Sequence, residues 1–173
     1  IMSKLPTKFI YRKNSSYHIY NRGNEKKEIF RGKKDYKVFK NQFFKYCKKY
    51  RLLSISFCLM PNHYHLIIKC WKNKDDISKF MHAFMTSYVM YFNREHKRVG
   101  RLFQSPFQIR RITDLKDLHT VINYLRKNPL EAELLSGLPL EKYEWFYLRD
   151  RMKKVKKKNI LSEDEQILNS GQA

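Results

Sequence analysis

The chain has 173 residues, 42% of them hydrophobic, and a formal net charge of +21 from 37 Lys and Arg against 16 Asp and Glu. This length and apolar content predict a folded domain with a substantial core and exclude an intrinsically disordered chain. No stretch is long and apolar enough to insert into a bilayer, so we expect no membrane partner. The charge predicts a polyanionic partner, and nucleic acid is the polyanion that basic proteins bind by releasing condensed counterions.

The first half of the chain alternates strand and helix patterns. Residues 16–21 are rich in β-forming side chains and predict a first strand that ends before Gly23. Residues 35–50 repeat aromatic side chains at helical spacing between lysines, which indicates an amphipathic helix. Two apolar runs, 52–60 and 64–71, flank a Pro-Asn turn and predict a β-hairpin.

The second half continues the alternation. Apolar residues recur with a period of 3.6 over residues 77–92 and predict a second helix, followed by a polar, basic loop over 94–101. Residues 107–112 alternate apolar and polar side chains, as a fourth strand does. Thr113 or Asp114 can cap a third helix, and we expect Pro129 to end it, because the residue before a proline avoids the helical region.

The order β-α-β-β-α-β-α predicts an α+β fold. It is the ferredoxin-like split βαββαβ arrangement, an antiparallel sheet with two helices on one face, plus an additional C-terminal helix. We assign residues 1–150 to this domain. Residues 151–173 are first basic and then acidic, and we expect them to form a flexible tail.

Three cysteines, Cys47, Cys58 and Cys70, show no close pairing. An odd number of scattered cysteines is typical of small buried side chains in a reducing cytoplasm. A zinc site that combines Cys58 and Cys70 with nearby histidines is disfavoured, because their spacing matches no common zinc pattern. No targeting segment is visible, and we expect a cytoplasmic protein.

The most informative residues are His63 and His65, which lie two apart in a predicted strand and therefore share a face. Two imidazoles on one rigid edge can begin a divalent-metal site, although such a pair is often only a half-buried polar face. On the third helix, Tyr124 and Asn128 are four residues apart and share a face. If that face lies over the histidines, the Asn128 oxygen is a third ligand. By spacing alone, a half-buried Tyr124 and a helix-capping Asn128 are favoured.

Four stretches of the chain resemble single-tyrosine HUH transposases, and most closely the REP-associated tyrosine transposases of bacteria. The HUH motif is two histidines around a hydrophobic residue, here His63-Tyr64-His65. The other similar stretches are residues 17–24 (YHIYNRGN), 100–107 (GRLFQSPF) and 123–129 (NYLRKNP). In order, the four cover about residues 15–150. Residues 130–133 and 143–147 depart from the family's usual pattern, which leaves target specificity open.

The resemblance implies a chemistry for these residues. Tyr124 would attack a phosphodiester of single-stranded DNA and form a 5′-phosphotyrosine, with Mg²⁺ or Mn²⁺ held by His63, His65 and Asn128. The substrate would be a DNA hairpin with a single-stranded flank, bound by a monomer or by a homodimer that exchanges the tyrosine helix. The resemblance also implies a bacterial protein that is associated with the nucleoid. Basic and polar residues near the expected rim are candidate DNA contacts: Arg22, Arg94, Arg101, Gln104, Arg110, Arg111, Lys127, Lys153 and Lys154.

Two other functions remain open at this level. A ferredoxin-like sheet also serves as a non-catalytic nucleic-acid-binding module, which stacks bases on aromatic side chains of the central strands. A metal-dependent nuclease with the same histidines would use water as its nucleophile and would form no covalent intermediate. Capture of a covalent protein–DNA adduct distinguishes the transposase from both.

Overall fold

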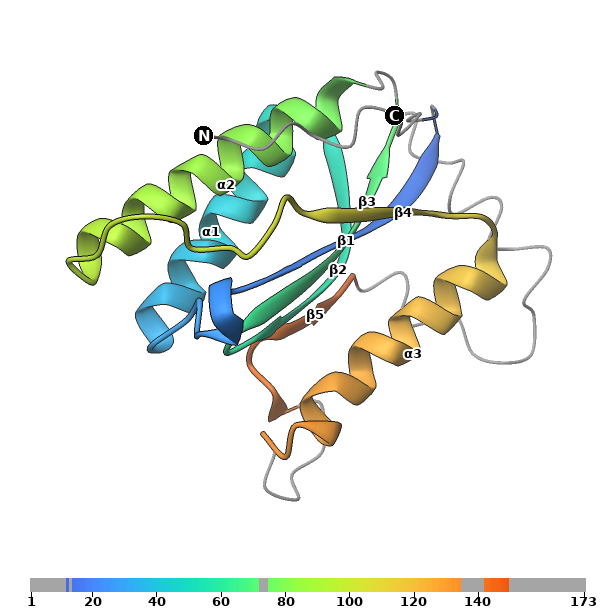
Figure 1. The fold of residues 1–173 in the computed structure, drawn as a ribbon. Coiled ribbons are helices and arrows are strands. Elements are labelled where there is room, and N and C mark those ends of the chain that lie inside the picture. The colour runs from blue at the N-terminus through green and yellow to red at the C-terminus, as the bar shows by residue number, and fades with distance from the viewer. Residues whose placement is uncertain (1–11, 13, 72–74, 135–141, 150–173) are drawn as a thin grey trace.

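The computed structural model describes residues 12, 14–71, 75–134 and 142–149. Figure 1 shows the elements, which follow in the order β1 (Ser15–Arg22), η1 (Asn24–Lys26), α1 (Lys33–Lys49), β2 (Leu52–Met60), β3 (His63–Cys70), α2 (Asp75–Glu95), β4 (Gln108–Ile112), α3 (Leu115–Glu131) and β5 (Phe146–Leu148). The strands and helices predicted from the periodicity are all present, with ends shifted by a few residues. The predicted tail over 151–173 lies outside the described residues.

The strands form one antiparallel sheet in the order β4-β1-β3-β2-β5. The first four strands have the ferredoxin-like order, so the predicted fold class is confirmed. A fifth strand goes beyond the prediction: Phe146–Leu148 pairs with β2 and extends the sheet at that edge. Three residues are too short a stretch for an alternating pattern to be recognised in the sequence.

The two faces of the sheet have separate cores. Helices α1 and α2 cover one face, where aromatic side chains such as Phe39, Phe43 and Phe84 pack against Tyr64 and neighbouring strand residues. Helix α3 covers part of the opposite face, with the buried side chains Leu118, Val121, Ile122 and Leu125 packed near Ile55, Ile67 and Ile112. Because side chains alternate along a strand, His63 and His65 lie on the same face as Ile67. We call this side of the sheet the α3 face.

Helix α3 begins as predicted but ends later. The Asp114 side chain caps its start by accepting a hydrogen bond from the Asp117 backbone N–H at 2.8 Å. The prediction that Pro129 ends the helix is wrong, because α3 continues to Glu131 with Pro129 buried inside it. A proline this close to the C-terminus removes a single backbone hydrogen bond, and the last turn closes through Ala132 N–H, which donates to the Asn128 carbonyl at 3.1 Å.

The cysteines, the basic loop and the length of the helices were also predicted from the sequence. All three cysteines are free and buried. Cys58 lies in the core beneath α3 and Cys70 in the core beneath α1 and α2, so the two thiols cannot share a zinc ion. The basic loop expected over 94–101 begins later, because α2 includes Arg94 in its last turn. Within the described ranges, no helix is long and apolar enough to span a bilayer.

Candidate active site

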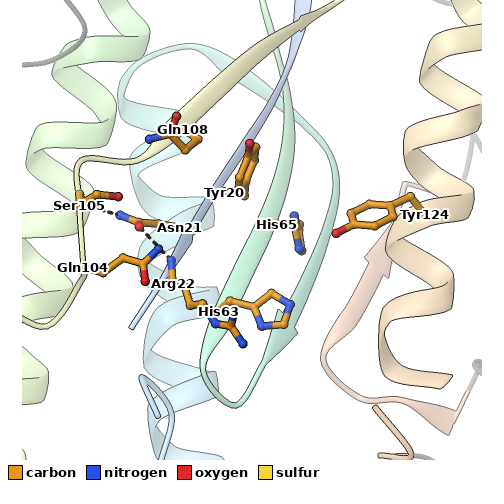
Figure 2. Close-up of a pocket in the computed structure, with 9 residues that line it drawn as sticks. All are labelled: Tyr20, Asn21, Arg22, His63, His65, Gln104, Ser105, Gln108 and Tyr124. Carbon is orange, nitrogen blue, oxygen red and sulfur yellow. Dashed lines mark hydrogen bonds between the residues drawn. The ribbon is translucent and has the colours of Figure 1, made fainter. Parts of the chain in front are cut away.

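An open pocket of about 280 Å³ lies on the α3 face, where the ends of three strands meet a loop and a helix (Figure 2). Strands β1 and β3 run side by side, and their alternating side chains form its floor. The loop before β4 and helix α3 form its walls. Its lining residues are Tyr20, Asn21, Arg22, His63, His65, Gln104, Ser105, Gln108 and Tyr124.

His63 opens β3, and each of its ring nitrogens faces an amide oxygen. The Nδ1 atom lies 2.7 Å from Asn62 Oδ1, and the Nε2 atom lies 3.3 Å from Asn128 Oδ1. The Asn62 amide is oriented because its Nδ2 donates to the Lys26 carbonyl at 3.2 Å. The Asn128 amide is oriented in the same way, by donation to the Tyr124 carbonyl at 2.8 Å. His63 therefore lies between two acceptors.

A neutral imidazole has one N–H and can donate to only one acceptor. Burial lowers the pKa of His63 below its ordinary value, so the ring is neutral near pH 7. If the shorter contact, to Asn62, takes the Nδ1 proton, the Nε2 lone pair of His63 faces the Asn128 oxygen. Two lone pairs that point at one another are stabilised by a cation between them.

His65 has one ring nitrogen without a hydrogen-bond partner among the described residues. Its side chain is buried, and its Nδ1 atom lies 3.0 Å from Nε2 of His18 on the adjacent strand β1. Its own Nε2 atom is buried without a hydrogen-bond partner among the described residues. Burial lowers the pKa of His65 to about 2. Burial and, secondarily, the nearby Arg110 guanidinium lower the pKa of His18 to about 4. Buried polar atoms without a partner are rare and often mark the position of an ion or ligand.

The Tyr124 side chain extends from α3 toward His65. Its side chain is 49% exposed, and its ring packs edge-on against His65 with the ring centroids 5.4 Å apart. Figure 2 shows the hydroxyl pointing toward His65 and into the pocket. Asn128 follows one helical turn later and contacts His63. A phenol, two imidazoles and a carboxamide of one chain therefore meet at one place.

These donor atoms fit a small divalent cation. Imidazole nitrogens suit divalent transition metals and a carbonyl-type oxygen suits Mn²⁺ or Mg²⁺, so this mixed set of donors can hold an ion such as Mn²⁺. Ligand atoms about 2.1 Å from one ion lie roughly 3 Å apart when they occupy adjacent octahedral positions, and His63 Nε2 and Asn128 Oδ1 are 3.3 Å apart. No three His, Cys, Asp or Glu side chains in the described ranges form a metal-binding group. A third protein ligand in the described ranges must therefore come from another type of side chain, and the Asn128 oxygen lies beside His63.

Arg22, one of the predicted DNA contacts, lines the pocket together with His63. Its backbone is held by neighbours: its N–H donates to Asn21 Oδ1 at 2.8 Å, and its carbonyl accepts from the Gln104 N–H at 3.1 Å. Its Nε atom is buried and has no hydrogen-bond partner among the residues described. The guanidinium group thus keeps a donor for an anion. Gln104, also predicted, lines the same pocket.

Other predicted contacts lie elsewhere. Arg94 belongs to α2, on the opposite face of the sheet, and the exposed Arg101 donates to the Gln104 carbonyl at 3.1 Å. Arg110 forms a two-pronged ion pair with Asp117 at 2.8 and 2.9 Å, so its charge is already compensated. Arg111, the next residue along β4, points to the opposite face, as strand alternation requires. Lys127 is exposed on α3, and Lys153 and Lys154 lie outside the described residues.

Several residues near the histidines were not predicted as site residues, among them His18, Tyr20 and Gln108. His18 and Tyr20 alternate with Arg22 along β1, and Tyr20 is directly opposite His65 in the strand pairing. Gln108 lies opposite Tyr20 on β4. The predicted ferredoxin-like order places β1 beside β3, so combining that order with the alternation of β1 would have identified His18 and Tyr20. Local patterns alone contain no such signal.

Comparison with known proteins decides the family. The sequence profile described as "Transposase IS200 like" matches residues 11–128. This segment includes His63, His65, Tyr124 and Asn128. The chain belongs to the IS200-like transposase family. The predicted resemblance is thereby confirmed, and the pocket lies within the part of the chain that defines the family.

Two similar proteins are informative. A curated Haemophilus influenzae protein named as a REP-associated tyrosine transposase is 24% identical over 102 residues, which are 54% of this chain and 58% of the relative. The match thus spans little more than half of each protein. A solved REP-associated tyrosine transposase bound to a REP hairpin has a TM-score of 0.64 at 16% identity, covering 84% of this chain and 82% of that one. At this identity the likeness shows a shared fold.

Proposed function

We propose that this chain is a metal-dependent single-stranded DNA transposase and endonuclease in which Tyr124 is the nucleophile. The observation that carries the proposal is the contact of Tyr124 with His65, since it brings a half-exposed phenol to a histidine whose Nε2 atom has no hydrogen-bond partner among the described residues. The contact forms within one chain, which supports a site assembled by a monomer rather than by exchange of α3 within a homodimer.

The reaction is a phosphoryl transfer that conserves the number of phosphoester bonds. The Tyr124 oxygen attacks the phosphorus of a phosphodiester and loses its proton to solvent. The bond from phosphorus to the 3′ oxygen breaks, and that oxygen takes up a proton to become a free 3′-OH. The 5′ phosphate stays on Tyr124, so its bond energy is kept and another 3′-OH can reverse the step without ATP.

His63, His65 and Asn128 would hold the Mg²⁺ or Mn²⁺ ion. When bound there, the ion polarises the phosphate and stabilises the negative charge that develops during transfer. Arg22 supplies its free guanidinium donor to a nonbridging phosphate oxygen. Asn128 has two tasks, because its oxygen serves the ion and its amide nitrogen is anchored to the carbonyl of Tyr124. The ligand and the nucleophile are thereby kept in register on one helical turn.

The proposed substrate is single-stranded DNA with a hairpin. The net charge of +21 supports a DNA partner, and the solved relative with the same fold is bound to a REP hairpin. Tyr20 lines the pocket with 38% of its side chain exposed and can stack on an unpaired base. Such a reaction would take place on bacterial DNA, in the cytoplasm.

A covalent-adduct assay with a hairpin oligonucleotide labelled at its 3′ end tests the proposal. With Mn²⁺ we expect a labelled protein band in denaturing gels, and an unlabelled 5′ fragment that ends in 3′-OH. Tyr124→Phe should abolish the band but leave DNA affinity within about twofold, because only a hydroxyl is lost. Tyr46→Phe on α1, across the sheet, is the matched control and should form the adduct. Adducts in Tyr124→Phe would refute the nucleophile.

The same gel separates the other functions predicted from the sequence. Cleavage without a covalent band would indicate a hydrolytic nuclease that uses water. Binding without any cleavage, at every metal tested, would indicate a non-catalytic nucleic-acid-binding module.

A further inference from the structure

The two histidines of the pocket make the same type of contact, which the proposed reaction does not explain. In each ring the Nδ1 atom contacts a neighbouring side chain, and the Nε2 atom faces the proposed metal site. His63 Nδ1 contacts Asn62 Oδ1 at 2.7 Å, and His65 Nδ1 contacts His18 Nε2 at 3.0 Å. The Nε2 atom of His65 has no partner in the described part of the chain, and that of His63 faces the Asn128 oxygen.

The hydrogen bond between His18 and His65 has two possible directions. If His18 Nε2–H donates, His65 carries its proton on Nε2, and a buried N–H is left without an acceptor. If His65 Nδ1–H donates, the unpaired Nε2 atom of His65 is a lone pair. Orphaned buried N–H groups are the rarer case in proteins, because a donor that loses water without a replacement costs about 1–3 kcal/mol. The second direction is therefore favoured.

We propose that His18 and Asn62 are positioning residues that accept the Nδ1 protons of His65 and His63. Both imidazoles are thereby held in the tautomer whose Nε2 lone pair is available to a cation. The inference rests on the proposed metal site and adds the two residues that prepare it. In metal sites generally, the nitrogen that binds the ion is set by the hydrogen bond that the other nitrogen makes.

The surroundings of both residues suit this task. His18 is 6% exposed and lies in the middle of β1, paired on both sides with other strands. Its ring lies between those of Tyr20 and Tyr124, at centroid distances of 5.1 and 6.4 Å, so it has little freedom to turn away. Asn62 is held by its bond to the Lys26 carbonyl, which keeps its oxygen directed at His63.

The first test reads the tautomers directly in the metal-free protein. Long-range proton–nitrogen NMR correlations distinguish a protonated ring nitrogen from an unprotonated one, and His82→Gln, an exposed position on α2, helps the assignment. We expect protons on Nδ1 of both His63 and His65 in the wild type. In His18→Leu, which removes the acceptor, His65 should shift toward the Nε2–H form. A wild-type His65 protonated on Nε2 would overturn the proposal.

The second test measures Mn²⁺ affinity by calorimetry and electron paramagnetic resonance. Loss of an outer hydrogen-bond partner costs about 10–100-fold in metal affinity, which we expect for His18→Leu and Asn62→Ala. His18→Gln and Asn62→Asp keep an acceptor oxygen and should bind within about threefold of wild type. The two conservative variants keep the test valid if His18→Leu or Asn62→Ala fails to fold. Circular dichroism would reveal such a failure. If His18→Leu binds Mn²⁺ as tightly as wild type, the positioning role is wrong.

The two tests also separate this inference from the proposal beneath it. Expected tautomers in a wild-type protein that fails to bind Mn²⁺ would overturn the metal site and leave the hydrogen-bond assignment standing. Mn²⁺ binding by a wild type with the opposite tautomer would overturn the positioning role and leave the metal site standing.

Discussion

Acidification of the metal-free protein should destabilise it, because two neutral histidines are buried under α3. His18 and His65 are 6% and 5% exposed, and their pKa values fall from 6.5 to about 4 and about 2. Above pH 6.5 the folded and unfolded states carry the same charge at these rings. Below pH 6.5 the unfolded chain binds protons that the folded chain does not. The stability that depends on neutral rings is therefore complete above pH 6.5 and is lost as the pH falls, down to about 4 for His18 and about 2 for His65.

The size of the effect follows from proton linkage. Between pH 7 and pH 5, protonation of an unfolded histidine favours the unfolded state by about 2 kcal/mol, while a folded ring with a pKa of about 4 stays neutral. His18 and His65 together should lower the free energy of unfolding by about 4 kcal/mol. That is a large part of the 5–15 kcal/mol that typical domains possess.

Urea unfolding followed by tryptophan fluorescence at pH 7, 6 and 5 measures this loss. His18→Leu removes one of the two buried rings, so about half of the wild-type loss should remain. Comparing the variant with the wild type cancels the contributions of every other titrating group. His82→Gln removes an exposed histidine and should retain the full loss. If His18→Leu loses as much stability as the wild type, His18 is not buried neutral and the reasoning fails.

Three further outcomes follow from single contacts. Asn128→Ala removes the proposed amide ligand and should weaken Mn²⁺ binding about 10–100-fold, measured by calorimetry; unchanged affinity would exclude Asn128 as a ligand. Gly23→Ala would place a Cβ 2.0 Å from the Lys27 carbonyl oxygen, so we expect more than about 2 kcal/mol of destabilisation in urea; wild-type stability would contradict that close approach. Arg22→Gln should weaken single-stranded DNA binding and lower the slope of log affinity against log salt by about one, whereas an unchanged slope would show that Arg22 makes no phosphate contact.

Much of the fold was predictable because its elements have strong local periods. The aromatic stripe of α1 and the alternation around the histidines follow from 3.6- and 2-residue repeats, which depend on neighbours close in the chain. Pro129 shows the limit of local reasoning. Its own geometry disfavours a helix before it, but Pro129 is buried in α3, and tertiary packing of the amphipathic face outweighs one lost hydrogen bond.

The candidate site also combines relations that are local in the sequence with contacts between distant elements. The sequence by itself determined that His63 and His65 share a face and that Tyr124 and Asn128 share a helical turn, because both relations are spacings along one element. Only the tertiary structure decided that Tyr124 packs against His65 and that His18 reaches the Nδ1 atom of that ring. Contacts between elements depend on strand order, on register and on how α3 crosses the sheet. Those quantities are set by the packing of whole faces, and no local pattern of residues encodes them.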